Sequence, residues 1–138
     1  MLLEQEMSIE GSDFTHAGLV STDVKALLKK IGLDPKLIRR VAIAAYEAEM
    51  NVIIHARRAR VKFNVTPTMV ELMFLDEGKG IADVEQAMQE GYSTATDEVR
   101  SMGFGSGMGL PNIKRNADKL DVRSVVGQGT TVHMQFFV

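Results

Sequence analysis

Residues 41–56, VAIAAYEAEMNVIIHA, constrain the fold more than any other stretch, because they predict a helix that is apolar on most of its circumference. Such a helix is expected to be buried, yet it carries Glu47 and Asn51 one turn apart on the same side. A buried carboxylate and a buried amide are costly unless a partner satisfies them. The pair therefore marks a candidate site, whereas Glu49 points nearly the opposite way and is expected at the surface. The apolar positions form two stripes at helical spacing: Ile38, Val41, Ala45, Ala48 and Val52, and then Ile43, Met50 and Ile54.

Composition excludes several classes of protein. The 138 residues suffice for one domain with its own core, and we expect residues 1–138 to form a single domain. Sixteen basic and 18 acidic residues give a net charge of −2, which makes no electrostatic case for binding nucleic acid or an anionic membrane. The absence of cysteine excludes disulfides and thiolate metal sites. No signal peptide is visible, and no apolar run approaches the ~20 residues of a membrane span, so a cytoplasmic protein is expected.

The remaining patterns predict an α+β fold. Alternation of apolar and polar residues indicates strands, and Asp34-Pro35 is a typical helix start, with an N-cap followed by proline. Strands are expected over residues 7–9, 58–65, 69–76, 121–126 and 130–138, and helices over residues 15–31, 35–55, 82–90 and 110–120. Residues 91–108 lack usable periodicity and are typical of a mobile loop. Together the elements predict a two-layer sandwich, with a mostly antiparallel sheet covered on one face by helices.

Two more polar residues are predicted on apolar faces. Asp76 ends a row that it shares with large apolar residues of its strand, and Thr130 begins the more apolar face of the last strand. Glycines then recur at every second position before the last helix, at Gly103, Gly105, Gly107 and Gly109. Such glycines let backbone N–H groups approach an anion, and a helix N-terminus adds positive potential. This combination favours phosphate binding, although it matches neither a Walker loop nor a Rossmann fingerprint.

In this order, the motifs resemble those of the GHKL ATPase superfamily, which includes gyrase and the ATP-binding domains of histidine kinases. The matching residues are Glu47-x-x-x-Asn51, Asp76-x-Gly78-x-Gly80, Gly105-x-Gly107-x-Gly109-Leu110 and Gly129-Thr130. Each motif alone has an ordinary explanation, such as a solvated helix face, a strand-ending turn, a flexible loop or a hairpin. Four motifs in order over residues 38–138 make the resemblance specific. The size and the run EAEMNVIIHA look like the stand-alone bacterial anti-sigma-factor serine kinases, and GSGMGLPNIKR looks like the related switch kinases.

The resemblance assigns a role to each motif. It implies that ATP and Mg²⁺ bind, with Asn51 as a metal ligand through its amide oxygen and Glu47 as the general base. Asp76 would accept a hydrogen bond from the adenine amino group, and Thr130 would assist through its hydroxyl and a water. Gly78 and Gly80 would let the adenine pack closely. The glycines from Gly103 to Gly109, with Leu110, would form the phosphate-binding end of a lid that starts near Gly91, and the candidate phosphate contacts are Lys79, Arg100 and Lys114.

One departure from the family pattern leaves the activity open. The anti-sigma kinases usually carry an arginine just before the Ser-Gly-Met-Gly run, where it reaches the γ-phosphate, but this chain has Gly105 there. Arg100 would have to replace it. The resemblance implies a protein serine/threonine kinase that regulates a partner-switching module by phosphorylating a small antagonist protein, by binding a sigma factor, or by both, with homodimerisation common among relatives.

Two alternatives remain. One is an ATP-sensing anti-sigma or adaptor module with little kinase activity. The other is a histidine-kinase-type ATPase domain, which ranks last because that class usually lacks a glutamate at the position of Glu47. His55, one turn beyond Asn51, is expected to be a packed residue, since the three histidines form no metal cluster in the predicted fold.

Overall fold

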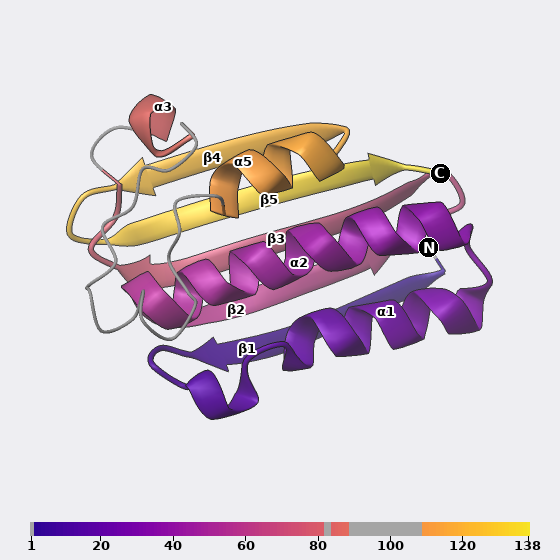
Figure 1. Ribbon diagram of the computed structural model, residues 1–138, viewed down its shortest axis with the longest axis horizontal. Helices are drawn as coiled ribbons and strands as arrows, with labels where there is room; N and C mark the ends of the chain where they lie inside the picture. The colour runs from indigo at the N-terminus through magenta and orange to yellow at the C-terminus, as the bar shows by residue number, and fades with distance from the viewer. Residues whose placement is uncertain (1, 82–83, 89–108) are drawn as a thin grey trace.

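Five strands form one antiparallel sheet, with the order β1-β2-β3-β5-β4 (Figure 1). The computed structural model describes residues 2–81, 84–88 and 109–138. The strands are β1 Leu3–Glu10, β2 Ala56–Val65, β3 Met69–Gly78, β4 Lys119–Val125 and β5 Gly129–Phe137. Alternation of apolar and polar residues explains four of the strands, whereas β3 is largely apolar on both faces.

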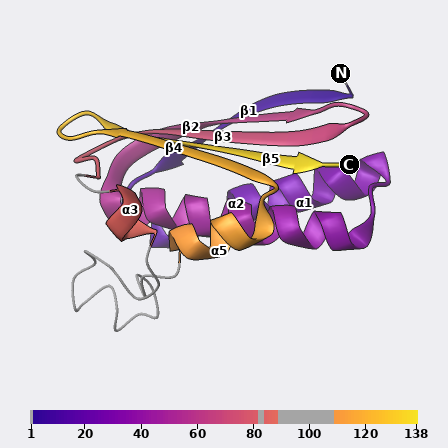
Figure 2. The same cartoon turned by 90° about the horizontal axis from the view of Figure 1, so that it is seen from above.

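The helices lie on one face of this sheet, as Figure 2 shows for α1, α2 and α5. They are a 3-10 turn at Phe14–His16, α1 Leu19–Ile31, α2 Pro35–His55, the short α3 Val84–Ala87 and α5 Gly109–Asn116. This arrangement confirms the predicted two-layer α+β sandwich. Within the described residues, no helix has the length and apolarity needed to cross a membrane.

The core lies between the sheet and α2. Inward residues of the central strands, such as Phe63, Phe74 and Phe136, are almost completely buried. The first predicted stripe of α2 faces them, and each of its five residues is at most 4% exposed: Ile38, Val41, Ala45, Ala48 and Val52. The second stripe is wrong at Ile43, which is 40% exposed because its side chain lies on an open side of α2.

The first helix begins later than its pattern suggests. Gly18 adopts a left-handed conformation with φ of +92°, which separates the 3-10 turn at Phe14–His16 from α1. The predicted start at residue 15 is therefore wrong. Asp34 caps α2 as expected, because its Oδ1 accepts a hydrogen bond of 2.7 Å from the N–H of Lys36.

The last helix ends earlier than the predicted residue 120. Arg40 on α2 donates to the carbonyl of Asn116 and to Oδ1 of Asp118, each at 2.9 Å. The N–H of Asp118 donates to the carbonyl of Gln135, and Asp118 Oδ2 accepts from the N–H of Phe137 at 2.7 Å. These bonds draw the chain onto the edge of β5, so residues 119 and 120 belong to β4. The predicted loop at residues 91–108 and part of the helix predicted at 82–90 lie outside the described residues.

Glu49 is buried, with 1% of its surface exposed, which corrects the predicted surface position. Its two oxygens accept hydrogen bonds from the N–H groups of Val20 at 3.1 Å and Ser21 at 3.3 Å. Burial raises the pKa of Glu49, and these N–H groups, with that of Gly18, oppose the rise. The first N–H groups of a helix lack partners within it, and Gly18 has no side chain to supply one. Glu49 on α2 therefore caps α1.

We expect Glu49→Ala to lower the free energy of unfolding by about 2 kcal/mol, because it leaves buried N–H groups without an acceptor. Glu49→Gln keeps one acceptor oxygen and should cost less. Urea unfolding followed by circular dichroism measures both. The exposed Glu4→Ala is the matched control, and equal midpoints for Glu49→Ala and Glu4→Ala would contradict the capping role.

Candidate functional site

The candidate residues gather at one end of the molecule. The C-terminal part of α2, the end of β3, the start of β5 and the N-terminus of α5 all lie toward the same end of the sheet (Figure 1). This brings the helix residues Glu47 and Asn51 to the end where Asp76, Thr130 and Gly109 also lie. Elements far apart in the sequence therefore share the predicted site.

Asp76 and Thr130 are in direct contact. Asp76 Oδ1 accepts a hydrogen bond of 2.9 Å from the backbone N–H of Thr130, which is 7% exposed. Burial raises the pKa of Asp76, and the Thr130 N–H opposes this rise. Among residues 2–81, 84–88 and 109–138, Asp76 Oδ2 has no hydrogen-bond partner. Asp76 therefore presents one partly buried acceptor oxygen at the strand end.

The hydroxyl of Thr130 bonds to Ser124 instead of Asp76. The two hydroxyl oxygens are 2.8 Å apart, and Ser124 Oγ also accepts from the N–H of Ile81 at 2.6 Å and donates to the carbonyl of Gly129. Sequence reasoning missed Ser124. The signal was the register of the last hairpin, in which Ser124 pairs with Thr130. This network fixes the segment after β3 against the β4–β5 hairpin.

Glycines allow this close approach of backbones. Gly129 has φ of +153°, and a Cβ there would lie 2.1 Å from the carbonyl oxygen of Asp76. Gly80 has φ of +77°, and a Cβ there would lie 2.5 Å from the carbonyl oxygen of Val125. At Gly78 the nearest atom would be the Cα of Ala56 at 3.1 Å. The described structure thus uses Gly80 and Gly129 to join the strand end to the hairpin.

Asn51 lies against the start of α5. A Cβ at Gly109 would be 2.9 Å from Asn51 Oδ1, so a larger residue at this position would require the Asn51 amide to shift. The next residue, Leu110, is 6% exposed and belongs to the core, which anchors α5 in this position. The predicted residues Arg100, Gly103, Gly105 and Gly107 lie outside the part of the chain that the structure describes.

Glu47 is half-buried between α2 and α5. Burial raises its pKa, and a hydrogen bond from Asn112 Nδ2 to Glu47 Oε1, 3.4 Å long, opposes the rise. A carboxylate with a raised pKa at a site of this kind is a candidate for proton transfer. Asn112 was not predicted from the sequence, although it lies one turn after Gly109 on the same helix.

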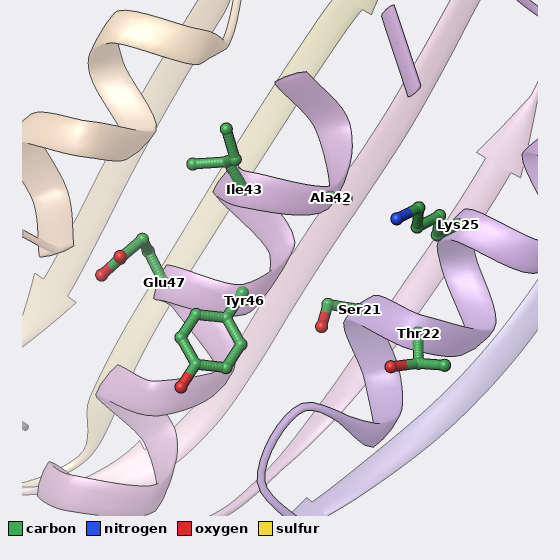
Figure 3. A pocket seen from close by; sticks show the side chains of 7 residues that line it. All are labelled: Ser21, Thr22, Lys25, Ala42, Ile43, Tyr46 and Glu47. Carbon is green, nitrogen blue, oxygen red and sulfur yellow. The ribbon is translucent and has the colours of Figure 1, made fainter. Parts of the chain in front are cut away.

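An open groove runs along α1 and α2 beside Glu47 (Figure 3). Its volume is about 350 Å³, and its apolar wall contains Ile43 and Tyr46, which are 40% and 37% exposed. Figure 3 shows Tyr46 between Glu47 and the α1 residues, and the Glu47 carboxylate pointing away from α1. The remaining lining residues are Ser21, Thr22, Lys25 and Ala42. The groove therefore borders Glu47.

The predicted basic contacts are at the surface. Lys79 and Lys114 are exposed, and the carbonyl of Lys79 accepts a hydrogen bond of 2.8 Å from the N–H of Gly127. Burial and, secondarily, the charge of Lys79 lower the pKa of His55, which agrees with a packed histidine. The described residues contain no group of three or more His, Cys, Asp or Glu side chains that could hold a metal ion.

Comparison with known proteins identifies the family. The model of the histidine kinase-like ATPase domain matches residues 12–136, which is most of the chain. The chain belongs to this family. Its relatives include an anti-sigma F factor from Caldanaerobacter subterraneus subsp. tengcongensis, which is 34% identical over 113 residues, or 77% of this chain and 76% of that protein. An anti-sigma F factor from Pasteuria penetrans is 36% identical over 111 residues, or 74% and 71% of the two chains.

Other members of the histidine kinase-like ATPase family extend the comparison. The serine/threonine-protein kinase RsbT from Bacillus subtilis is 27% identical over 108 residues, or 75% of each chain. A structure of the mycobacterial sensor histidine kinase MprB superposes with a TM-score of 0.56 at 16% identity, covering 98% of this chain and 97% of that one. The latter likeness shows the fold alone. The predicted GHKL resemblance is confirmed, and membership in an ATPase family implies that ATP binds.

We expect Glu47→Gln to raise the free energy of unfolding at pH 7. Because burial raises the pKa of Glu47, the ionised carboxylate destabilises the folded state above the ordinary value of 4.5. Below that value the carboxyl is protonated in both the folded and the unfolded protein, and the difference disappears. Wild type and Glu47→Gln should therefore differ at pH 7 and converge below about pH 4.

Urea unfolding at a series of pH values measures this difference. The exposed Glu4→Gln serves as the control and should follow the wild type throughout. A Glu47→Gln protein less stable than the wild type at pH 7 would show that burial does not penalise the charge.

Proposed function

We propose that this protein is an ATP-dependent serine/threonine kinase that phosphorylates a small antagonist protein and binds a sigma factor in the same regulatory module. One observation carries the proposal: Glu47 lies half-buried, one turn before Asn51, beside an open groove. A general base must reach both the bound phosphates and the acceptor hydroxyl. The relatives named anti-sigma F factor and serine/threonine-protein kinase support this function.

The site has groups suited to ATP. Asp76 Oδ2 is a partly buried acceptor without a partner among the described residues, as the adenine amino group requires. Thr130 holds Asp76 in place through its backbone N–H, and Gly78 and Gly80 border the same position. The N-terminus of α5 at Gly109 would face the phosphates, together with Gly103, Gly105 and Gly107. Lys79, Arg100 and Lys114 would supply positive charge.

Asn51 would hold Mg²⁺ through its amide oxygen. Magnesium prefers oxygen ligands and commonly uses one or two from the protein, with phosphate and water oxygens completing the shell. The approach of Gly109 leaves Oδ1 of Asn51 at the start of α5, where phosphate is expected. ATP would supply the phosphoryl group, and the metal would neutralise its charge.

Glu47 would take the proton from the acceptor hydroxyl. Burial raises the pKa of Glu47, and the hydrogen bond that its carboxylate accepts from Asn112 opposes this rise and favours the ionised form that a base requires. The acceptor would be a segment of a protein substrate carrying serine or threonine, which packs on the exposed Tyr46 and Ile43 of the groove. In this proposal the hydroxyl would arrive along the groove between α1 and α2, and the phosphates would lie at the N-terminus of α5.

A second candidate is an ATP-sensing anti-sigma or adaptor module with little kinase activity. Gly105 favours this candidate, because the anti-sigma kinases that the chain resembles usually carry an arginine at this position, where it reaches the γ-phosphate. Both candidates use the same ATP site. They differ in whether Glu47 acts as a base.

We expect Asp76→Asn to weaken ATP binding by roughly ten- to a hundred-fold, because a charge-assisted hydrogen bond to a buried carboxylate is worth about 1.5–3 kcal/mol. Titration calorimetry with ATP and ADP, with and without Mg²⁺, measures the dissociation constants. Asp121→Asn is the control, since Asp121 is exposed on β4. Unchanged binding in Asp76→Asn would remove Asp76 from the adenine site, and no binding by the folded wild type would overturn the ATP proposal.

We expect Glu47→Ala to reduce phosphotransfer by about 10²–10⁴-fold, the usual contribution of a general base, with ATP affinity nearly unchanged. Transfer from γ-labelled ATP to an antagonist-domain protein encoded beside the gene measures the rate. Glu4→Ala should match the wild type. Transfer at the wild-type rate by Glu47→Ala would refute the base, whereas slow transfer by the wild type itself would favour the sensing module.

A further inference from the structure

Helix α5 is fixed along α2 by contacts at three successive levels. Gly109 lies against Asn51, Asn112 contacts Glu47, and the end of α5 at Asn116 accepts from Arg40. The two helices run in opposite directions (Figure 1), so each contact further toward the C-terminus of α5 lies further toward the N-terminus of α2. The middle contact is the only one of the three that involves the proposed base.

Asn112 is itself held in a defined orientation. Its side-chain oxygen accepts a hydrogen bond of 2.7 Å from Arg115 Nη1, one turn further along α5. A guanidinium group only donates, so it must face the amide oxygen, and the amide NH₂ is thereby directed toward Glu47. The backbone carbonyl of Asn112 also accepts from Asn116 Nδ2 at 2.8 Å. Arg115 thus fixes the orientation of the Asn112 amide, with its NH₂ group toward Glu47.

We propose that Asn112, oriented by Arg115, is a positioning residue for Glu47: it binds Oε1 and leaves Oε2 to receive the proton of the acceptor hydroxyl. This inference rests on the proposed kinase function. A carboxylate with one oxygen held samples fewer orientations than a free one, and misplacement of a catalytic group is costly. The 3.4 Å contact leaves room for it to shorten when the acceptor binds.

The same arrangement links the base to the phosphate-binding end of the site. Asn112 and Gly109 lie one turn apart on one short helix, so the position of α5 sets both the distance to Asn51 and the orientation of Glu47. The Asn112 amide also opposes the effect of burial on the pKa of Glu47 and thereby helps to keep it ionised. Asn112 therefore both orients the Glu47 carboxylate and favours its ionised form, and both effects support the proposed role of Glu47 as a base.

The first test is a kinetic comparison that a purely structural role would not reproduce. We expect Asn112→Ala to lower the single-turnover transfer rate at saturating ATP roughly ten-fold, with the ATP dissociation constant within two-fold of the wild type. Arg115→Ala should show a smaller loss of the same kind, and Arg115→Lys, which keeps a donor, should recover most of it. Arg123→Ala on the exposed part of β4 is the matched control. Equal losses in ATP affinity and rate, or no loss in rate, would overturn the inference.

The second test does not depend on activity. The side-chain NH₂ signals of Asn112, assigned by their disappearance in Asn112→Ala, should shift in ¹H–¹⁵N spectra of Glu47→Ala and Arg115→Ala but not of Arg123→Ala. Unmoved signals in Glu47→Ala would overturn the contact even if the wild type is an active kinase. If the signals shift in Glu47→Ala but the wild type transfers no phosphate, the contact is real, but the proposed kinase function and the catalytic purpose of the contact are overturned.

Discussion

Helix α2 carries three polar side chains within little more than one turn, and the structure depends on how each is satisfied. Glu49 accepts from the first N–H groups of α1, Glu47 accepts from Asn112 of α5, and Asn51 lies against Gly109. Polar contacts therefore add to the apolar core in placing the two helices on either side of α2. Since buried polar groups must find partners, these contacts set one arrangement of helices over the sheet.

Burial raises the pKa of three carboxyl groups, but their hydrogen bonds separate structural from functional roles. Both oxygens of Glu49 accept backbone N–H groups, and the residue is 1% exposed, so burial keeps it out of reach of a ligand. Asp76 uses one oxygen on Thr130, and Glu47 has one long bond to Asn112. A raised pKa alone would have marked all three as site residues. The hydrogen bonds to both oxygens explain Glu49 as part of the fold, whereas Asp76 and Glu47 keep acceptor capacity that the proposed site would use.

Most inward faces of the sheet and of α2 could be predicted from the sequence because they follow regular periods. Phe63 and Phe136 lie inside as the alternation of their strands predicts, whereas β3 is apolar on both faces and its period did not show that Phe74 lies inside. Glu49 could not be placed in this way, since a helical period gives the direction of a side chain but not whether a neighbouring helix or solvent lies there. The end of α5 was missed for a related reason: Arg40 and Asp118 terminate it through contacts 76 and 78 residues apart in sequence.

The sequence motifs identified individual candidate residues of the site, but not how these residues contact one another or which neighbours support them. Asp76 and Thr130 were expected to cooperate, but through the hydroxyl, because a sequence pattern does not show that the backbone N–H of Thr130 points at Asp76. Ser124 and Asn112 belong to no motif and became visible only through register and helix packing.

The placement of Glu47 also bears on the choice between a kinase and a module that only senses ATP. A module of the second kind needs the adenine and phosphate contacts that we propose for Asp76 and the start of α5, but it has no use for a base. A half-buried carboxylate destabilises the fold at neutral pH, and its bond to Asn112 offsets this only in part. A glutamine at position 47 would keep an acceptor for Asn112 without the charge. Retention of the acid, held by an amide that Arg115 orients, therefore favours proton transfer as the reason for Glu47.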